Sequence, residues 1–278
     1  MLTKSQLKDI FSRYSFRPLK RFGENYLIDS NIKDKIIEEA HVGAGDVVLE
    51  VGPGLGALTM DLARTGATVY AVEKDKKAFA ILCDIVTKDL PNLKLSCGDI
   101  LDFDIDPIAS AKPIKVVGNL PYYITTPILE NLIKHRAAIG SILIVVQKEF
   151  AERILAEPGS RAYGSLSCFI RYYMKSVYLY TVKRGCFYPE PKVDSSLIRL
   201  EVLKAPSVVV KDEALFFKIV RSSFGQRRKS IINSLSRKQA LDMPKAKLAA
   251  ILERAGIDPT TRPESLSIEA FAAIANAI

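Results

Sequence analysis

The sequence of 278 residues is poor in the residue types that build metal centres and disulfide frameworks. It contains only two histidines and four cysteines, and Cys83, Cys97, Cys168 and Cys186 are scattered without a CxxC spacing. Metal sites and disulfide-rich secreted domains both depend on clustered ligands or paired cysteines. We therefore expect no bound metal, and we expect the four cysteines to behave as small buried hydrophobic residues.

Long apolar runs are also missing. No stretch of the sequence approaches the roughly 18–20 apolar residues that a membrane-spanning helix needs. The first six residues, MLTKSQ, lack the apolar core of a secretory signal. With 48% hydrophobic and 26% charged residues, the composition is that of a globular protein. We predict a cytoplasmic protein without membrane association, built from one large domain with or without a small appendage.

Acidic residues are outnumbered by basic ones, 31 to 40, which gives a net charge of +9 and a pI near 9.3. The excess is concentrated in residues 1–21, which look like a basic arm. Such a charge suits a polyanionic partner, because each phosphate neutralised by Lys or Arg releases counterions. Charge alone leaves the partner open, since many basic proteins bind no nucleic acid.

From about residue 30, strand-like and helix-like segments alternate. We predict strands over 46–51, 68–73, 93–97, 114–118 and 141–147, with helices between them. The first helix, capped by Ser30 or Asn31, precedes these strands. Alternation of this kind predicts an α/β fold with a doubly wound, mostly parallel sheet. Segments 176–182 and 195–202 suit an antiparallel closing pair.

A seam at Lys204-Ala205-Pro206-Ser207 leads into a stretch with only helical patterns. We place a domain boundary near residue 205. Residues 1–205 would form the α/β domain with the basic arm, and residues 206–278 a small all-α domain.

The first predicted strand runs into Glu50-Val51-Gly52-Pro53-Gly54-Leu55-Gly56, which opens a helix. Its glycines allow the backbone to approach a bound ligand closely. The spacing is GxGxG with an acid two positions before the first glycine, whereas dinucleotide-binding proteins use GxGxxG.

Two carboxylates follow the next strands, Glu73 at the end of the second and Asp99 after the third. One can accept hydrogen bonds from both ribose hydroxyls, and the other from an adenine amine. Together they predict an adenosine-shaped cofactor, S-adenosylmethionine, in a class I (Rossmann-like) methyltransferase. The alternative interpretation makes Glu73 a solvated strand end and Asp99 a cap of a helix or turn.

The fourth predicted strand ends in Asn119-Leu120-Pro121-Tyr122, where ligands of open α/β sheets bind. An adenine amino nitrogen is a poor nucleophile because its lone pair is delocalised into the ring. Hydrogen bonds to the Asn119 oxygen and to a backbone carbonyl would localise that lone pair and stabilise the developing charge. Pro121 stiffens the turn, and Tyr122 can stack on an extruded base. We predict that these four residues form the catalytic site; an ordinary strand-to-helix turn is the alternative.

With these motifs the chain resembles the KsgA/RsmA family of ribosomal RNA adenine dimethyltransferases, which is related to the Erm resistance methylases. The resemblance runs from about residue 20 to the C-terminus. The matching stretches are RFGENYL at 21–27, EVGPGLG at 50–56, GNLPY at 118–122, FYPEPKVDS at 187–195 and FGQRRK at 224–229. Two positions depart from the common pattern, Glu24 in place of glutamine and Tyr123 in place of a smaller polar residue.

The resemblance implies a role for each matching position. Glu73 would hold the ribose, Asp99 the adenine of the cofactor, and Asn119 would lie between cofactor and target base. Tyr122 would stack on that base, with Phe187 as a second aromatic wall. The cofactor contacts implied in full are Asn25, Leu27, Gly52, Gly54, Glu73, Asp99 and Asn119.

A basic run begins at Arg227, Arg228 and Lys229, with apolar residues on the other helix face. It is either a solvated surface or a face that contacts RNA phosphates; the net charge and the basic arm favour RNA binding. The resemblance implies methylation of two adjacent adenines near the 3′ end of small-subunit (16S) rRNA. The substrate would be a pre-assembled small ribosomal subunit, the setting ribosome biogenesis, and the enzyme a monomer.

Four other functions remain as alternatives. The nearest is an Erm-type enzyme acting on large-subunit rRNA, although the tail at residues 256–267 resembles the KsgA group. A DNA adenine methyltransferase shares the logic of the motif but has proline where this chain has Leu120. A non-catalytic RNA-binding or ribosome assembly factor would not need Glu73, Asp99 and Asn119. A dehydrogenase fits the glycine spacing least well.

Overall fold

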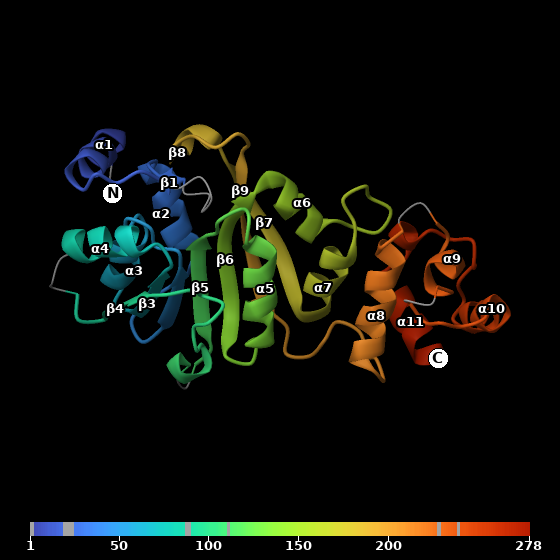
Figure 1. Cartoon of the computed structure of the whole chain (residues 1–278). Helices are drawn as coiled ribbons and strands as arrows, with labels where there is room; N and C mark the ends of the chain where they lie inside the picture. Colours follow the sequence, from blue (N-terminus) through green and yellow to red (C-terminus); the bar gives the residue numbers. More distant parts are fainter. Residues whose placement is uncertain (1–2, 19–24, 87–89, 110–111, 227–228, 238–239) are drawn as a thin grey trace. The chain divides into compact units, whose positions relative to one another are not determined.

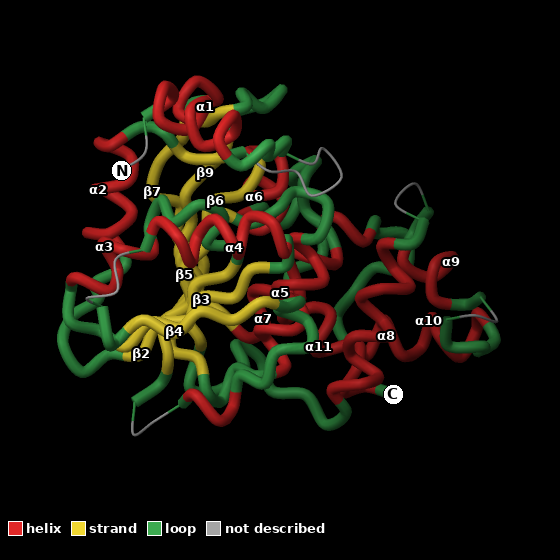
Figure 2. The backbone as a smooth tube through the Cα atoms, turned by 60° about the vertical axis from the view of Figure 1, so that its left-hand side comes forward, coloured by secondary structure: helices red, strands yellow, loops and turns green. Residues whose placement is uncertain are grey.

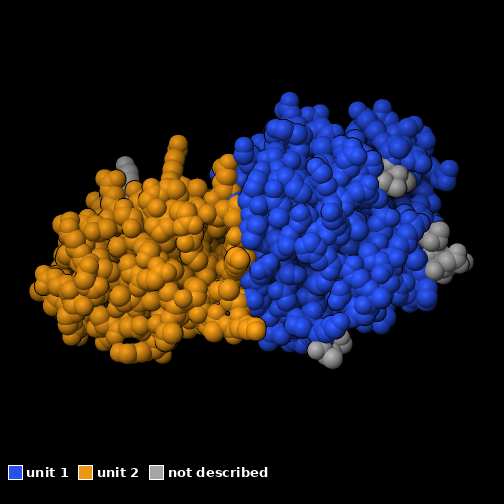
Figure 3. All heavy atoms as spheres, turned by 180° about the vertical axis from the view of Figure 1, so that it is seen from behind, with its two compact units in different colours: residues 1–151, 177–202 blue, residues 152–176, 203–278 orange. Residues whose placement is uncertain are grey.

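The computed structural model describes residues 3–18, 25–86, 90–109, 112–226, 229–237 and 240–278. The chain divides into two compact units (Figure 3). The first contains Met1–Ala151 and Val177–Val202, and the second contains Glu152–Ser176 and Leu203–Ile278.

A seven-stranded sheet is the framework of the first unit, in the order β4-β3-β2-β5-β6-β9-β7 (Figures 1 and 2). Strands β2 to β6 pair in parallel, and β9 pairs antiparallel with β6. This confirms the predicted mostly parallel, doubly wound sheet with an antiparallel closing strand. The strands are β2 (Val47–Val51), β3 (Thr68–Glu73), β4 (Leu93–Cys97), β5 (Ile114–Asn119), β6 (Ile139–Gln147), β7 (Met174–Val182) and β9 (Ser195–Val202).

The strand order reverses between β2 and β5. From β2 the chain moves outward through β3 to β4, then returns to β5 on the other side of β2 and continues to β6. Ligands of open α/β sheets bind outside the carboxyl ends of the strands at such a reversal. The topology alone therefore directs attention to the ends of β2, β3 and β5.

Helices α2 (Ser30–Glu39) and α3 (Thr59–Arg64) of the first unit bury apolar side chains against the sheet. Leu58 and Leu62 at α3, with Ile36 of α2, pack into one core with Val48 and Val117 of the sheet. The helix α2 is capped by Asp29, not by Ser30 or Asn31 as predicted, because the Asp29 carboxylate accepts the Ile32 N–H at 3.0 Å. The other helices of this unit are α1 (Lys4–Arg13), α4 (Lys76–Ile85) and α5 (Thr125–Lys134). Helix α6 (Lys148–Leu155) begins in the first unit and ends in the second.

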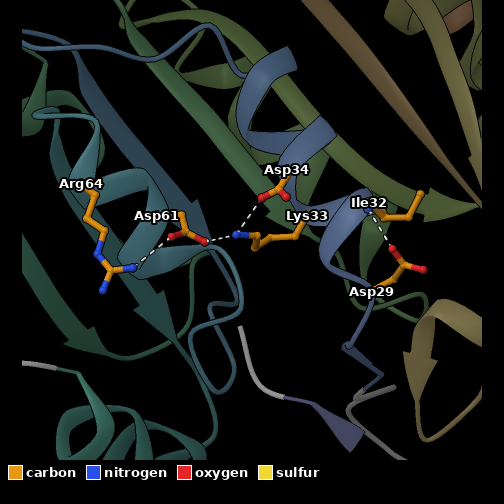
Figure 4. Close-up of polar contacts among 6 residues, drawn as sticks. All are labelled: Asp29, Ile32, Lys33, Asp34, Asp61 and Arg64. Atoms are coloured by element: carbon orange, nitrogen blue, oxygen red, sulfur yellow. Dashed lines mark hydrogen bonds and ion pairs between the residues drawn. The ribbon is translucent and has the colours of Figure 1, made fainter.

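An ion-pair chain joins α2 to α3 (Figure 4). The Lys33 ammonium lies 2.6 Å from a carboxylate oxygen of Asp61 and 2.8 Å from one of Asp34. The other oxygen of Asp61 accepts a hydrogen bond from Arg64 at 3.2 Å. These contacts hold the first turn of α2 against the helix that follows the glycine turn.

The basic arm folds in part as a helix, which the charge pattern did not predict. Thr3 and Gln6 form a capping box at the start of α1. Leu7 and Ile10 of this helix are buried in a small core with Leu55. A two-stranded sheet of β1 (Tyr26–Leu27) and β8 (Phe187–Tyr188) lies nearby in the same unit and pairs Leu27 with Phe187.

The second unit is helical, with α7 (Ser165–Tyr173), α8 (Glu213–Phe224), α9 (Ile231–Leu235), α10 (Lys245–Arg254) and α11 (Ile268–Ala277). It begins again at Leu203, close to the boundary predicted near residue 205, but it also contains Glu152–Ser176. Aromatic packing joins this segment to the second unit. The ring centroids of Phe169 of α7 and Phe217 of α8 are 5.5 Å apart, and those of Tyr172 and Phe216 are 5.1 Å apart. The compact units therefore differ from the predicted division in one segment, because Glu152–Ser176 groups with residues 203–278.

The four cysteines are free, but the expectation that all are buried holds for Cys168 alone. Cys83 lies on an exposed position of α4, and Cys97 is exposed because β4 is the edge strand of the sheet. Cys186 is half-buried. Within the described residues, no helix is long and apolar enough to cross a membrane.

Candidate active site

A pocket of the first unit opens at the carboxyl ends of β2, β3 and β5, where the strand order reverses. It brings together every residue predicted for the cofactor and for catalysis, from segments far apart in the sequence. These residues are Asn25, Leu27, Gly52, Gly54, Glu73, Asp99, Asn119, Leu120, Pro121, Tyr122 and Phe187. Of the predicted RNA-binding residues, Lys229 is exposed in the second unit, and Arg227 and Arg228 lie outside the described residues.

The glycine turn after β2 is tied to the end of β3 through Glu73. Gly52 and Gly54 have positive φ angles of 69° and 56°, which glycine adopts without strain. The Gly54 N–H donates to one oxygen of the Glu73 carboxylate at 2.9 Å, and the Asp75 N–H donates to the other at 2.7 Å. Because the Gly54 N–H already donates to Glu73, it is not available to a pyrophosphate, which would need that donor.

Asp99 follows β4 and faces the same pocket. Its carboxylate accepts the Leu101 N–H at 3.1 Å and forms an ion pair with Lys74. Burial raises the pKa of Asp99, but the hydrogen bonds from Lys74 and Leu101 outweigh burial and hold that pKa below its usual value. Asp99 is therefore an ionised acceptor at neutral pH. The sequence pattern did not identify Lys74.

The pocket is negatively charged. Its described lining contains four acidic side chains, Glu50, Glu73, Asp75 and Asp99, and one basic side chain, Lys74. Even with Glu50 protonated near neutral pH, as its raised pKa implies, the other acidic side chains outnumber Lys74. A negative pocket of this kind favours a cationic ligand over a phosphate-bearing one. S-adenosylmethionine, with a sulfonium and an ammonium group, fits this charge, and Glu73 and Asp99, the two acceptors predicted for its adenosine, both line the pocket.

Asn119 ends β5 with its side chain oriented by a backbone group. Its carboxamide NH₂ donates to the Asn25 carbonyl at 2.9 Å. Because a carbonyl only accepts, the nitrogen end of the amide is fixed on Asn25, and the oxygen end remains as the acceptor in the pocket. The carbonyl of Pro121 accepts hydrogen bonds from Ile124 and Thr125 at 3.2 and 3.0 Å, which makes the Leu120 carbonyl the better candidate for a backbone acceptor.

Three aromatic side chains surround this turn. Tyr122 is half-buried, and its hydroxyl lies 2.7 Å from the Ser195 hydroxyl. Phe187 is buried in the pocket wall, whereas Tyr123 is 52% exposed at the pocket rim. An aromatic slot beside a fixed amide acceptor is an arrangement that can hold a planar base.

Glu50 is a further pocket residue for which no role was predicted, although it is the acid two positions before the first glycine of the GxGxG turn. It is 2% exposed, and within the described part of the chain its Oε2 atom has no hydrogen-bond partner. Burial raises the pKa of Glu50 to about 8, against an opposing effect of the Thr59 hydroxyl and with a further rise from Glu73. A positively charged ligand beside this unpaired oxygen would favour the ionised form of Glu50.

The raised pKa of Glu50 predicts a pH-dependent stability. Between pH 4.5 and about 8 the unfolded chain has lost this proton and the folded chain keeps it, so stability falls as pH rises through that window. The uncharged Glu50→Gln variant escapes this loss. Without cofactor, the free energy of unfolding of the variant should equal that of the wild type near pH 5. At pH 8 it should be higher than that of the wild type, by an amount on the order of a few kcal/mol. Urea unfolding at both pH values measures this; an equal difference at the two would contradict it.

No group of three or more metal-ligating side chains occurs in the described part of the chain.

The family model for "Ribosomal RNA adenine dimethylase" matches residues 16–278. Ribosomal RNA small subunit methyltransferase A of Clostridium botulinum is 42% identical over 98% of both chains. The protein of that name from Bacillus mycoides is 41% identical over 99% of this chain and 96% of its own.

Two solved structures are similar over most of the chain. A dimethyladenosine transferase from Plasmodium falciparum has a TM-score of 0.76 and 26% identity, covering 90% of this chain and 95% of its own. The 23S rRNA methyltransferase ErmE has a TM-score of 0.69 and 26% identity, covering 91% of this chain and 99% of its own. The pocket, the fold and these matches agree: the chain belongs to the ribosomal RNA adenine dimethylase family, enzymes whose methyl donor is S-adenosylmethionine.

Proposed function

We propose that this enzyme dimethylates the amino groups of two adjacent adenines near the 3′ end of small-subunit rRNA, in a pre-assembled small ribosomal subunit. The observation that carries the chemistry is the Asn119 amide, whose nitrogen is held by the Asn25 carbonyl at 2.9 Å within the pocket that contains Glu73 and Asp99. The small-subunit target comes from the names of the 41–42% identical relatives. Acting on ribosomal subunits places the enzyme in the cytoplasm.

In this proposal the carboxylates of Glu73 and Asp99 bind different parts of the cofactor. Glu73, fixed by two backbone N–H groups, accepts from the ribose hydroxyls, and Asp99 accepts from the adenine amine. Gly52 and Gly54 allow the backbone to approach the amino-acid end, and Asn25 and Leu27 cover the site from the N-terminal side. When bound, S-adenosylmethionine supplies a methyl group activated by positively charged sulfur.

The residues at the end of β5 orient and activate the target nitrogen. The Asn119 oxygen and the Leu120 carbonyl accept its two protons, which localises the lone pair and stabilises the positive charge that develops on nitrogen. Tyr122 and Phe187 hold the base from its faces. No side chain has to act as a strong base, because the methylated amine is acidic until it releases a proton to water. Alignment is the main catalytic contribution.

We assign recognition of the ribosomal subunit to basic residues, some of which lie in the helical second unit. Lys229 and Arg237 are exposed there. If Lys229 contacts a phosphate, Lys229→Ala should weaken subunit binding a few-fold at physiological salt and reduce the slope of log K against log salt by about 1. Filter binding across a salt series measures both, with Lys247→Ala, another exposed lysine of this unit, as the control. An unchanged slope would remove Lys229 from the interface.

The second candidate function is methylation of large-subunit rRNA, favoured by the similarity to ErmE. The two candidates separate in one experiment. Isolated small and large subunits that lack these methyl groups are incubated, separately, with the protein and labelled S-adenosylmethionine, and the rRNA nucleosides are identified by mass spectrometry. We expect labelled dimethyladenosine from small subunits only. Label confined to the large subunit, or absent from both, would overturn the proposal.

A further inference from the structure

The base-stacking residue Tyr122 is held at both ends of its side chain. Its backbone belongs to the turn that Pro121 stiffens, and its hydroxyl forms a 2.7 Å hydrogen bond with the Ser195 hydroxyl. Either hydroxyl can be the donor. Ser195 has no exposed surface, so the bond is shielded from competing water on the serine side. The motif that contains Ser195 was recognised in the sequence, but no function of Ser195 emerged from it.

Ser195 is a rigid support. It is the first residue of β9 and pairs with Gln147 at the end of β6. The preceding residue, Asp194, accepts the Lys148 N–H on its carbonyl at 3.1 Å and the Arg184 N–H on its carboxylate at 3.0 Å. The serine hydroxyl is therefore presented by a strand end that is fixed on both sides, 73 residues along the chain from the ring that it contacts.

Stacking on a base does not require the phenol hydroxyl of Tyr122, since a phenylalanine ring offers the same face. Placing a hydroxyl in a half-buried site is unfavourable unless it is hydrogen-bonded. Burial raises the pKa of Tyr122, with Ser195 opposing the rise, so the phenol keeps its proton near neutral pH and does not serve as a base. What remains for the hydroxyl is control of the plane of the ring.

We propose that Ser195 is a positioning residue for methyl transfer: its hydroxyl fixes the plane of the Tyr122 ring, and thereby the tilt of the stacked adenine. The inference rests on the proposed function of this site. Small changes of tilt matter because the target nitrogen has to lie in line with the methyl group while its protons stay on Asn119 and Leu120. Ser195 acts through Tyr122 and does not itself contact the base.

The test is a double-mutant cycle with Ser195→Ala, Tyr122→Phe and the double variant. Ser196→Ala is the matched control, because Ser196 is equally buried on the same strand but on the opposite face. Single-turnover methylation of undermethylated small subunits gives the rate of the chemical step, and calorimetry gives the affinity for S-adenosylmethionine. Thermal unfolding reports the stability of each variant.

We expect each single variant to lower the methylation rate by about 3- to 10-fold, the effect of one hydrogen bond. The double variant should lose no more than either single one. Cofactor affinity should stay unchanged, and Ser196→Ala should react at the wild-type rate. Multiplicative losses in the double variant, or a Ser195→Ala defect matched by lost cofactor binding, would show a merely structural role and overturn the inference. A wild type that methylates neither subunit would instead overturn the proposed function, and the inference with it.

Discussion

Asn119→Ala should lower the rate of methyl transfer by about 100- to 1,000-fold, while the affinity for S-adenosylmethionine changes far less. The magnitude is that of removing one preorganised hydrogen-bonding group from a site of developing charge. Asn119 supplies such a group because the Asn25 carbonyl holds its nitrogen end at 2.9 Å and leaves the oxygen end for the target amine. Single-turnover methylation of small subunits, with calorimetry of cofactor binding, measures the two quantities separately.

Asn119→Asp tests the orientation of the amide as well as its presence. The variant keeps the size of the side chain but places a carboxylate oxygen against the Asn25 carbonyl, so two acceptors face each other. We expect a loss of rate comparable to that of the alanine variant.

A structural asparagine provides the control. The Asn92 carboxamide donates to the Ala63 and Ala67 carbonyls at 2.7 and 2.6 Å and is not part of the pocket lining. Asn92→Ala should lower the melting temperature without slowing the chemical step. If Asn119→Ala methylated small subunits at the wild-type rate, the assignment of Asn119 would be wrong.

The second large effect concerns Glu73. Glu73→Ala should raise the Kd for S-adenosylmethionine by about 100-fold or more, because hydrogen bonds to a charged acceptor contribute roughly 1.5–3 kcal/mol each and the ribose offers two donors. The variant also removes the acceptor of the Gly54 and Asp75 N–H groups, which loosens the glycine turn. Calorimetry with S-adenosylmethionine measures the change.

Glu73→Gln separates shape from charge. The amide can satisfy only one of the two N–H donors with its oxygen, and its nitrogen opposes the other, so affinity should fall although the volume is kept. Glu38→Gln, an exposed position of α2, controls for loss of one negative charge. Equal affinities for wild type and Glu73→Ala would exclude the predicted ribose contact.

Much of the fold could be predicted from the sequence because its strands are short, apolar and separated by clear turn residues. Strands β3 and β4 begin and end at the predicted residues. Prediction failed where a segment is stabilised by distant partners. The helix α1 buries Leu7 and Ile10 against residues more than 40 positions away, and α7 joins the helical unit through its aromatic contacts with α8.

The candidate site divides in the same way. The positions of Glu73, Asp99 and Asn119 at the pocket could be predicted from sequence because each ends or follows a predicted strand, and parallel strands end at one edge of the sheet. Lys74 and Ser195 could not, since the importance of each depends on a single contact, with Asp99 or with Tyr122, across 25 or 73 residues of chain. The sequence around a residue does not show such long-range contacts.

All of these proposals require that the pocket at the ends of β2, β3 and β5 hold the adenosine of the cofactor beside Asn119. A crystal structure of the protein with S-adenosylhomocysteine tests it most directly. We predict that the Glu73 carboxylate lies within hydrogen-bonding distance of the ribose hydroxyls, that Asp99 accepts from the adenine amine, and that the sulfur faces Asn119. An adenosine bound elsewhere, or turned so that its ribose lies away from Glu73, would contradict the claim.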